Sequence, residues 1–306
     1  MNHHIPILCD EVVENLIDKP EGIYMDCTVG FGGHAKQILN KLSKKGFLVG
    51  LDIDPYALNE SEEKLTQCFK NYSLFNSSYI EFPKILNEIK LDKVDGFLFD
   101  LGISSYQVNS AHRGFSFMTD GPLDMRFNQQ ENTQTAKDIL YNIDEKNLCD
   151  IIRIYGEERY AKRIAKNIIK SVKKNDLNTT FDLKKTICNS IPNFKSHKSL
   201  ARVFQAIRIA VNDEVEALKQ TLKKCLNHLN KDGRIAVITF HSIEDRIVKH
   251  FFKDSVIYEN SSYNIEYKNT EIDFELINKK PITPSKFELK KNSRSRSAKL
   301  RVAKLI

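Results

Sequence analysis

The sequence predicts an α/β protein in which a parallel sheet is interrupted by a long helical insertion. In the first hundred residues, short apolar runs alternate with stretches of helical character, as in chains where strands and helices alternate. Residues 134–230 then carry apolar side chains at three- and four-residue spacing, which indicates helices. A further parallel strand is expected only at 233–240.

The expected elements follow in chain order. Four strands precede the insertion, at 23–28, 47–52, 72–75 and 94–100, with helices between them at about 33–45, 55–70 and 79–90. Pro55 and Pro83 lie near two expected helix starts, where proline is tolerated. Residues 103–130 are rich in Ser, Gly, Asn and Asp, and residues 255–285 give no firm signal. The alternating apolar and basic residues of 299–306 predict a last strand.

A length of 306 residues allows one large domain or two, and the helical block inserted into the α/β pattern predicts two. The first is discontinuous and comprises residues 1–104 and 206–306. The second is the helical insertion at 105–205.

The composition indicates a globular protein with a polyanionic partner, or with a solvated lysine-rich surface. The net charge is +7, the pI is about 8.9 and 41% of the residues are hydrophobic. The six cysteines are scattered without a C-x-x-C pair, so neither disulfides nor a metal site is expected. No signal peptide precedes the first strand and no run of ~18 apolar residues occurs, which favours a soluble cytoplasmic protein.

The most informative stretch is the apolar run that ends in Asp26 and is followed by Gly30-Phe31-Gly32-Gly33. Glycines between a strand and a helix let backbone N–H groups approach a ligand closely. The next strand ends in Asp52, which is placed to accept hydrogen bonds from a ribose. Together the two strands predict a nucleotide-like ligand.

The glycine pattern alone leaves three interpretations open. Gly30-x-Gly32-x-x-Ala35 fits the dinucleotide-binding fingerprint. Asp26-x-x-x-Gly30-x-Gly32 resembles the first motif of S-adenosylmethionine-dependent methyltransferases. A structural glycine turn is the third. Asp26, Asp52 and Asp100 at successive strand ends make helix capping alone a weaker explanation, because ligands sit beyond the carboxyl ends of such strands.

Longer segments resemble the MraW/RsmH family. The longest match is Arg113-Gly-Phe-Ser-Phe-Met-Thr-Asp-Gly-Pro-Leu-Asp-Met-Arg126. The other matching segments are 4–12, 26–34, 100–107, 155–165, 204–214, 240–249 and 293–301. The resemblance implies a class I S-adenosylmethionine-dependent methyltransferase sheet with an inserted helical substrate-recognition domain. It also implies methylation of the N4 amine of a cytidine in the decoding region of 16S rRNA, within the small ribosomal subunit.

The resemblance assigns the cofactor, S-adenosylmethionine, to seven residues. Gly32, Gly33 and His34 would contact its methionine end, and Asp52 would hold the ribose hydroxyls. Tyr79 stands where the family more usually has Phe beside the adenine, and Asp100 and Gln107 would approach the adenine or sulfonium side. One departure is Tyr106, which replaces the proline of the family's Ser-Ser-Pro-Gln motif and leaves this loop less fixed.

Asp100 is the candidate catalytic residue. The cytosine amine is a poor nucleophile because its lone pair is delocalised into the ring, so the enzyme's task is alignment and hydrogen bonding to the amine. A carboxylate after the fourth strand suits that task. The alternative is that Asp100 only binds cofactor, and solvent can take the proton, so no dedicated base is assigned.

Several residues are candidates for RNA contact, each with a structural alternative. Phe115 and Phe117 would stack on a base or fill a core. Arg113 and Arg126 would contact phosphates or form internal salt bridges to Asp120 or Asp124. His241 would lie near the acceptor pocket, although Ser242 and Glu244 after it favour a helix N-terminus. Arg294 and Arg296, in a basic tail, would contact phosphates or flank an edge strand, and Arg159, Lys162, Arg163 and Lys166 have the same two interpretations.

The predicted partner is therefore 16S rRNA, with no membrane and no metal. Whether the protein is a monomer or a homodimer is left open, as is the choice between naked RNA and an assembled subunit. The alternatives are another RNA or DNA amino-methyltransferase, an NAD-type oxidoreductase, and a ribosome-assembly factor that binds RNA without turnover.

Overall fold

The computed structural model describes residues 6–131, 133–192, 196–254, 256–259, 264–268 and 274–306. The chain divides into two compact units. Unit 1 comprises Met1–Gly102 and Val215–Ile306, and unit 2 comprises Ile103–Glu214. The insertion expected at 105–205 lies within unit 2, which extends to Glu214, two residues beyond the end of the helix Ser196–Asn212.

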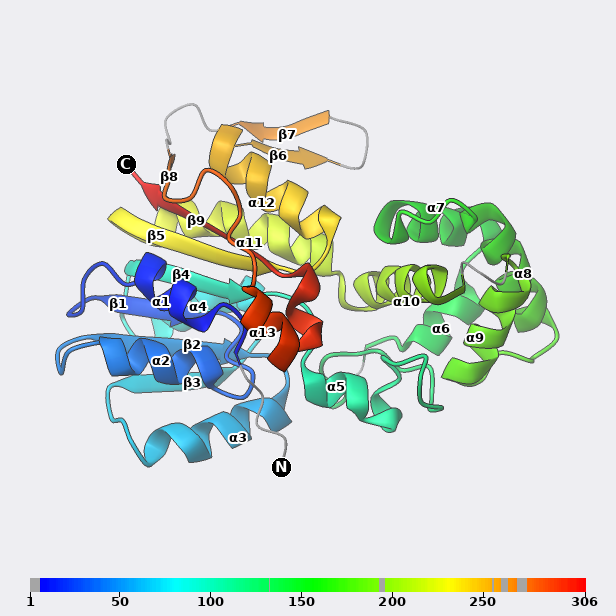
Figure 1. The fold of residues 1–306 in the computed structure, drawn as a ribbon, viewed down its shortest axis with the longest axis horizontal. Helices are drawn as coiled ribbons and strands as arrows, with labels where there is room; N and C mark the ends of the chain where they lie inside the picture. Colours follow the sequence, from blue (N-terminus) through cyan, green and yellow to red (C-terminus); the bar gives the residue numbers. More distant parts are fainter. Residues whose placement is uncertain (1–5, 132, 193–195, 255, 260–263, 269–273) are drawn as a thin grey trace. The chain divides into compact units, whose positions relative to one another are not determined.

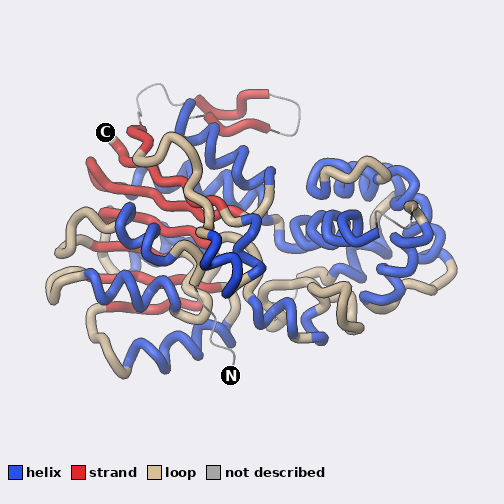
Figure 2. The backbone as a smooth tube through the Cα atoms, viewed as in Figure 1, coloured by secondary structure: helices blue, strands red, loops and turns tan. Residues whose placement is uncertain are grey.

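Unit 1 is built on a seven-stranded sheet of order β3-β2-β1-β4-β5-β9-β8 (Figure 2). The strands are β1 Ile23–Asp26, β2 Phe47–Asp52, β3 Tyr72–Asn76, β4 Val94–Asp100, β5 Leu229–Thr239, β8 Phe274–Leu276 and β9 Lys299–Leu305. The first five are parallel, and β9 is antiparallel to both β5 and β8. The predicted α/β fold and the parallel strand after the insertion are confirmed. The last strand lies inside the sheet, so its interpretation as an edge strand was wrong.

Helices cover both faces of this sheet (Figure 1). They are α1 Cys9–Leu16, α2 Gly33–Lys41, α3 Pro55–Thr66, α4 Phe82–Glu88, α11 Glu214–His228 and α12 Ser242–Asp254. Met25 and Phe97 pack in one core with α4, α11 and α12, whereas Tyr24 and Leu98 pack in a second core with α1 and α2. Successive side chains of a strand point to opposite faces, so burial on both explains why the strands read as continuous apolar runs.

Smaller elements complete unit 1. A short helix, η1 Tyr79–Glu81, precedes α4, and α13 Lys286–Lys291 and η4 Ser293–Ser297 precede β9. A separate two-stranded sheet pairs β6 Val256–Glu259 with β7 Asn264–Lys268. These two strands and β8 fall in the region that gave no firm sequence signal.

Unit 2 is helical, as predicted. Its elements are α5 Ser105–Asn109, η2 Ala111–Arg113, α6 Ala136–Asn142, α7 Glu145–Gly156, α8 Ala161–Lys173, α9 Thr180–Asn189 and α10 Ser196–Asn212. Thr135 and Asp138 form a capping box that starts α6, and Thr179 and Asp182 do the same for α9. The helices enclose their own apolar core, which includes Leu140, Ile152, Ile164, Leu183 and Ile207.

Among the helices that the structure describes, none combines the length and the apolar character that a membrane span requires.

Candidate active site

The carboxyl ends of β1, β2 and β4 bring three carboxylates to one edge of the sheet in unit 1. Asp26 is in register with Gly50 of β2 and Leu98 of β4, so Asp52 and Asp100 each lie two residues beyond it. Asp26 is fully buried, whereas Asp52 and Asp100 are partly exposed. The edge therefore carries the acidic residues at the place where ligands bind in doubly wound sheets.

The loop from β1 to α2 needs its glycines. Gly30 and Gly32 have φ values of +53° and +75°, which side chains rarely adopt. A Cβ on Gly32 would lie 2.5 Å from the Ser61 Oγ, and one on Gly33 would lie 3.0 Å from the Pro6 Cβ. Helix α2 begins directly afterwards without an acidic residue in its first turn. The loop thus presents a helix N-terminus, a favourable place for an anionic group.

Asp52 holds this loop in place. Its Oδ2 accepts a hydrogen bond of 2.6 Å from the Gly30 N–H, and its Oδ1 accepts one of 2.8 Å from the Asp54 N–H. The carboxylate at the end of β2 is therefore linked to the glycine loop after β1.

His34 and Asp100 form a second link across the edge. Nε2 of the buried His34 lies 3.5 Å from Oδ2 of Asp100. Burial lowers the pKa of His34, but the Asp100 carboxylate and the Cys9 thiol together outweigh it and raise the pKa to about 10. The imidazole is then protonated at neutral pH and pairs with Asp100. The Asp100 backbone N–H donates a 2.7 Å hydrogen bond to the Thr28 Oγ1, which fixes the end of β4.

Asp26 is the most deeply placed of the three acids. Burial raises its pKa to about 7, although His34 and the Thr28 N–H, which donates to Oδ1 at 3.1 Å, act in the opposite direction. Among the described residues, the two carboxylate oxygens Asp26 Oδ2 and Asp100 Oδ1 are buried without a hydrogen-bond partner. Each such atom costs ~1–3 kcal/mol. A ligand with ammonium and hydroxyl groups would satisfy the two carboxylates.

Tyr79 lies in η1, and its ring meets the Phe99 ring of β4 edge-on at 5.9 Å between centroids. The residue as a whole is half-buried. Its placement beside an adenine stays a prediction.

Gln107 belongs to unit 2 and caps α5. Its Oε1 accepts a 3.0 Å hydrogen bond from the Ser104 N–H, while the Gln107 N–H donates to the Ser104 Oγ at 3.1 Å. The Ser-x-x-Gln spacing is the sequence signal of such a capping box, and sequence reasoning missed it. The predicted contact of Gln107 with the cofactor stays a prediction.

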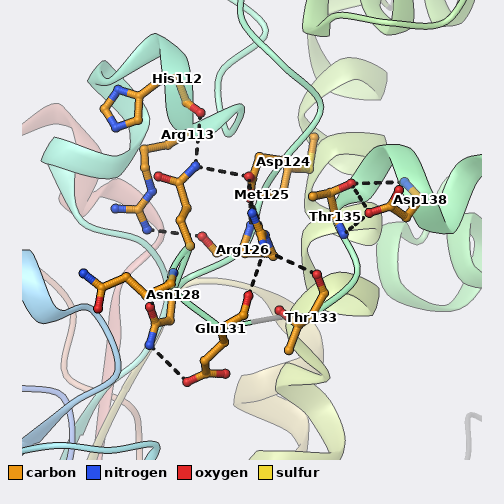
Figure 3. Close-up of polar contacts among 12 residues, drawn as sticks. His112, Arg113, Asp124, Met125, Arg126, Asn128, Glu131, Thr133, Thr135 and Asp138 are labelled. Carbon is orange, nitrogen blue, oxygen red and sulfur yellow. Dashed lines mark hydrogen bonds and ion pairs between the residues drawn. The ribbon is translucent and has the colours of Figure 1, made fainter.

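Arg113 and Arg126 both bind within the loop that they flank (Figure 3). The Arg126 guanidinium makes a bidentate pair with Asp124, at 3.0 and 2.8 Å, and its Nη1 donates to the Glu131 carbonyl at 2.9 Å. Nη2 of the buried Arg113 donates to the carbonyls of Arg126 and Phe127. The arrangement stabilises the loop; phosphate contact by either side chain remains untested.

Phe115 and Phe117 pack within unit 2. Phe115 is buried and stacks on Phe127 at 5.9 Å between centroids. Phe117 is partly buried and meets Phe204 edge-on at 5.4 Å. Both rings thus contribute to the core of this unit, and base stacking by them remains a prediction.

His241 directly precedes α12, as the helix-start signal indicated. Its Nδ1 accepts a 3.3 Å hydrogen bond from the Glu244 N–H, and the Glu244 Oε2 accepts from the His241 N–H at 3.3 Å and the Phe240 N–H at 2.8 Å. The pair acts as a capping box with histidine in the place of serine. A role of His241 toward the acceptor base stays a prediction.

The basic tail divides into exposed and paired residues. Arg294 and Arg296 are exposed on η4, where the Arg294 N–H donates to Asn292. Arg301 and Lys299 of β9 instead bind the two carboxylate oxygens of Asp245 at 2.7 and 2.8 Å. Arg294 and Arg296 are thus exposed on the surface of unit 1, and their phosphate contact stays a prediction.

Comparison with known proteins identifies the family. The family model described as the MraW methylase family matches residues 1–306. Ribosomal RNA small subunit methyltransferase H of Caldicellulosiruptor saccharolyticus is 46% identical over 311 residues, which cover 100% of each chain. The protein of the same description from Clostridium botulinum (strain 657 / Type Ba4) is 45% identical over 307 residues, or 99% of each chain.

Among solved structures, a putative rRNA-methylase from Clostridium thermocellum covers 97% of this chain and 94% of its own, with 12% identity and a TM-score of 0.45. The family match over the whole chain contradicts the oxidoreductase alternative and confirms the predicted class I methyltransferase fold. The chain therefore belongs to the MraW methylase family and is a methyltransferase whose methyl donor is S-adenosylmethionine.

Proposed function

We propose that this protein transfers a methyl group from S-adenosylmethionine to the N4 amine of a cytidine in the decoding region of 16S rRNA, within the small ribosomal subunit. The observation that carries the reaction class is the sheet edge in unit 1, where a glycine loop meets Asp26, Asp52 and Asp100. The description of the relatives as ribosomal RNA small subunit methyltransferases supports the substrate class. The net charge of +7 agrees with a polyanionic partner.

The residues at this edge fit the cofactor. Gly32 and Gly33 leave room for backbone to approach its methionine end, beside His34. Asp52 suits the ribose hydroxyls, and the unsatisfied Asp26 Oδ2 suits a cationic group of the cofactor. When bound, S-adenosylmethionine supplies a methyl group already activated by its sulfonium.

Asp100 is the residue that acts on the amine. Its backbone is fixed by Thr28, and its Oδ2 faces the His34 imidazolium, which leaves Oδ1 to accept a hydrogen bond from the cytosine amine. That bond localises the nitrogen lone pair and orients it toward the methyl carbon. Transfer to this nitrogen would leave the electron pair of the former carbon–sulfur bond on sulfur. The amine then releases a proton to solvent.

Unit 2 is assigned to RNA recognition in this proposal. Its phenylalanines and arginines, Phe115, Phe117, Arg113 and Arg126, would then shape the loop that meets the RNA, since their side chains already hold it together. On unit 1, the exposed Arg294 and Arg296 are the candidates for phosphate contact and His241 is the candidate near the acceptor base.

The decisive experiment incubates the protein with isotope-labelled S-adenosylmethionine and small subunits from a strain that lacks the enzyme, followed by mass analysis of the rRNA. We expect one added methyl group on a cytidine N4 in the decoding region. Asp100→Asn should lower the transfer rate by about a hundredfold while cofactor binding persists. Subunit binding without methyl transfer by the wild-type protein would instead support an assembly factor and refute the proposal.

A further inference from the structure

Helix α8 of unit 2 presents an exposed row of four lysines, Lys162, Lys166, Lys170 and Lys173, which we call the α8 lysine row. Their spacing of four, four and three residues places them on one side of the helix. The opposite side is buried in the core of unit 2 through Ile164, Ala165 and Ile168. The row therefore lies on the side of α8 that faces away from the core of unit 2.

The row is part of an uneven charge distribution. Residues 103–214 hold 18 Lys and Arg against 13 Asp and Glu, a net +5 of the chain's +7. Helix α8 itself has five basic residues and no acidic residue. By contrast, Lys299 and Arg301 of unit 1 are both paired with Asp245. Within the described part of the chain, no carboxylate forms an ion pair with any lysine of the row.

The stability of the folded protein does not explain why these four lysines lie on one side of α8. A solvated helix face usually mixes both signs, since opposite charges four residues apart stabilise a helix and like charges destabilise it. Lys162, Lys166 and Lys170 are like charges at that spacing, so the row lowers the stability of its own helix. A ligand that brings negative charge along the whole row would compensate for the repulsion.

We propose that the α8 lysine row binds the phosphate backbone of the RNA substrate, independently of base sequence. Successive lysines rise by about 6 Å along the helix axis, so the row offers a line of point charges to a chain of phosphates. Next to the row, the Arg159 guanidinium lies 4.6 Å from the Tyr160 ring centroid and donates to its hydroxyl, which adds a further exposed cation.

An anionic lipid surface is a poorer partner for the same charges. A helix that lies in a membrane interface exposes an apolar face for insertion. The apolar face of α8 is occupied by the core of unit 2. The identity of the RNA, but not the phosphate contact itself, rests on the function proposed above.

The test measures binding of a fluorescently labelled 16S rRNA transcript over a salt series. The triple variant Lys162→Gln, Lys166→Gln, Lys170→Gln removes three charges and keeps good helix formers. We expect its affinity at 0.1 M salt to fall by about tenfold to a hundredfold, and its slope of log affinity against log salt to become shallower by about 2. The same three positions changed to Arg should bind as the wild type does.

A matched control changes Lys41, Lys44 and Lys70 to Gln. These lysines are exposed on unit 1 and form no ion pair with a described residue. The control should keep the wild-type salt slope, and melting curves should show the α8 variant to be at least as stable as the wild type. If the triple variant fails to fold, Lys166→Gln alone should make the slope shallower by about 1.

Wild-type affinity and slope in the α8 variant would overturn the proposal, as would an equal loss in the control or binding to phosphatidylserine vesicles but not to the transcript. The outcome of this binding experiment does not depend on the outcome of the methylation assay. An α8-dependent salt slope without cytidine methylation would refute the proposed function and leave the lysine row as an RNA-binding surface.

Discussion

Asp52 carries two backbone hydrogen bonds, one of which holds the glycine loop. Asp52→Ala therefore removes both the proposed ribose contact and the support of Gly30. We expect it to weaken the binding of S-adenosylhomocysteine by ~1.5–3 kcal/mol through lost charge-assisted hydrogen bonds. Isothermal titration calorimetry measures this, with Asp92→Ala at an exposed position of unit 1 as the control. Unchanged affinity in the Asp52 variant would refute the ribose assignment.

His34 makes stability depend on pH. Its pKa rises from 6.5 to about 10 on folding, so its stabilising contribution is complete below pH 6.5 and is lost as pH rises toward 10. Asp26 acts in the same direction, since its pKa rises from 3.8 to about 7 and the folded state loses stability as pH rises through that range. Urea denaturation should give a free energy of unfolding that falls between pH 6.5 and 10, with a flatter profile for His34→Gln. An identical profile in the variant would contradict the His34–Asp100 pairing.

At single positions, the sequence predicted which residues lie at the ends of strands. It missed residues whose role depends on contacts with distant parts of the chain. Asp26, Asp52 and Asp100 could be found because parallel strands end at one edge. Thr28 could not, because its hydrogen bond to the Asp100 N–H joins residues 72 apart and no local pattern marks it. For Arg126, the sequence left open a phosphate contact or an internal salt bridge, because an arginine two residues after Asp124 is compatible with both. The structure contains the salt bridge to Asp124.

The loop of residues 113–131 is an element without regular structure whose stability depends on Arg126. Lysine cannot reproduce the bidentate contact with Asp124 or reach the Glu131 carbonyl at the same time. Arg126→Lys should therefore destabilise unit 2 by ~1–3 kcal/mol, because buried partners lose their hydrogen bonds. Chemical denaturation checks the size of the loss. Binding of S-adenosylhomocysteine should not change, and a wild-type unfolding curve would show that the loop does not depend on this pair.

Helices and strands were predicted well where apolar periodicity was strong, as in α7 and α8 of unit 2 and in the buried strands of unit 1. The position of β9 in the sheet was not predicted. A strand at the edge and a strand between two partners can show the same alternation of apolar and basic residues. Pairing with β8 places β9 inside the sheet, and β8 lies in the region that gave no firm sequence signal.

The two units have separate cores, which leads to a test on the whole molecule. Replacing residues 103–214 with a Gly/Ser linker should leave S-adenosylhomocysteine binding intact, because the glycine loop and the three carboxylates all lie in unit 1. RNA methylation should be abolished, because the proposed recognition surface is gone. Calorimetry and the subunit methylation assay measure the two properties. A shortened protein that folds and still methylates would show that unit 2 is dispensable.

The place of unit 2 in the chain also has a kinetic consequence. β4 and β5 are neighbours in the sheet, yet all of unit 2 and α11 separate them along the sequence. Closing a flexible loop of that length would cost on the order of 4 kcal/mol in chain entropy. The regular elements of unit 2 are helices, whose backbone hydrogen bonds join residues close in sequence and form quickly. Early folding of unit 2 would replace a long flexible loop with a folded connection between β4 and β5. The rate at which β5 joins the sheet should therefore depend on how fast the inserted helices fold.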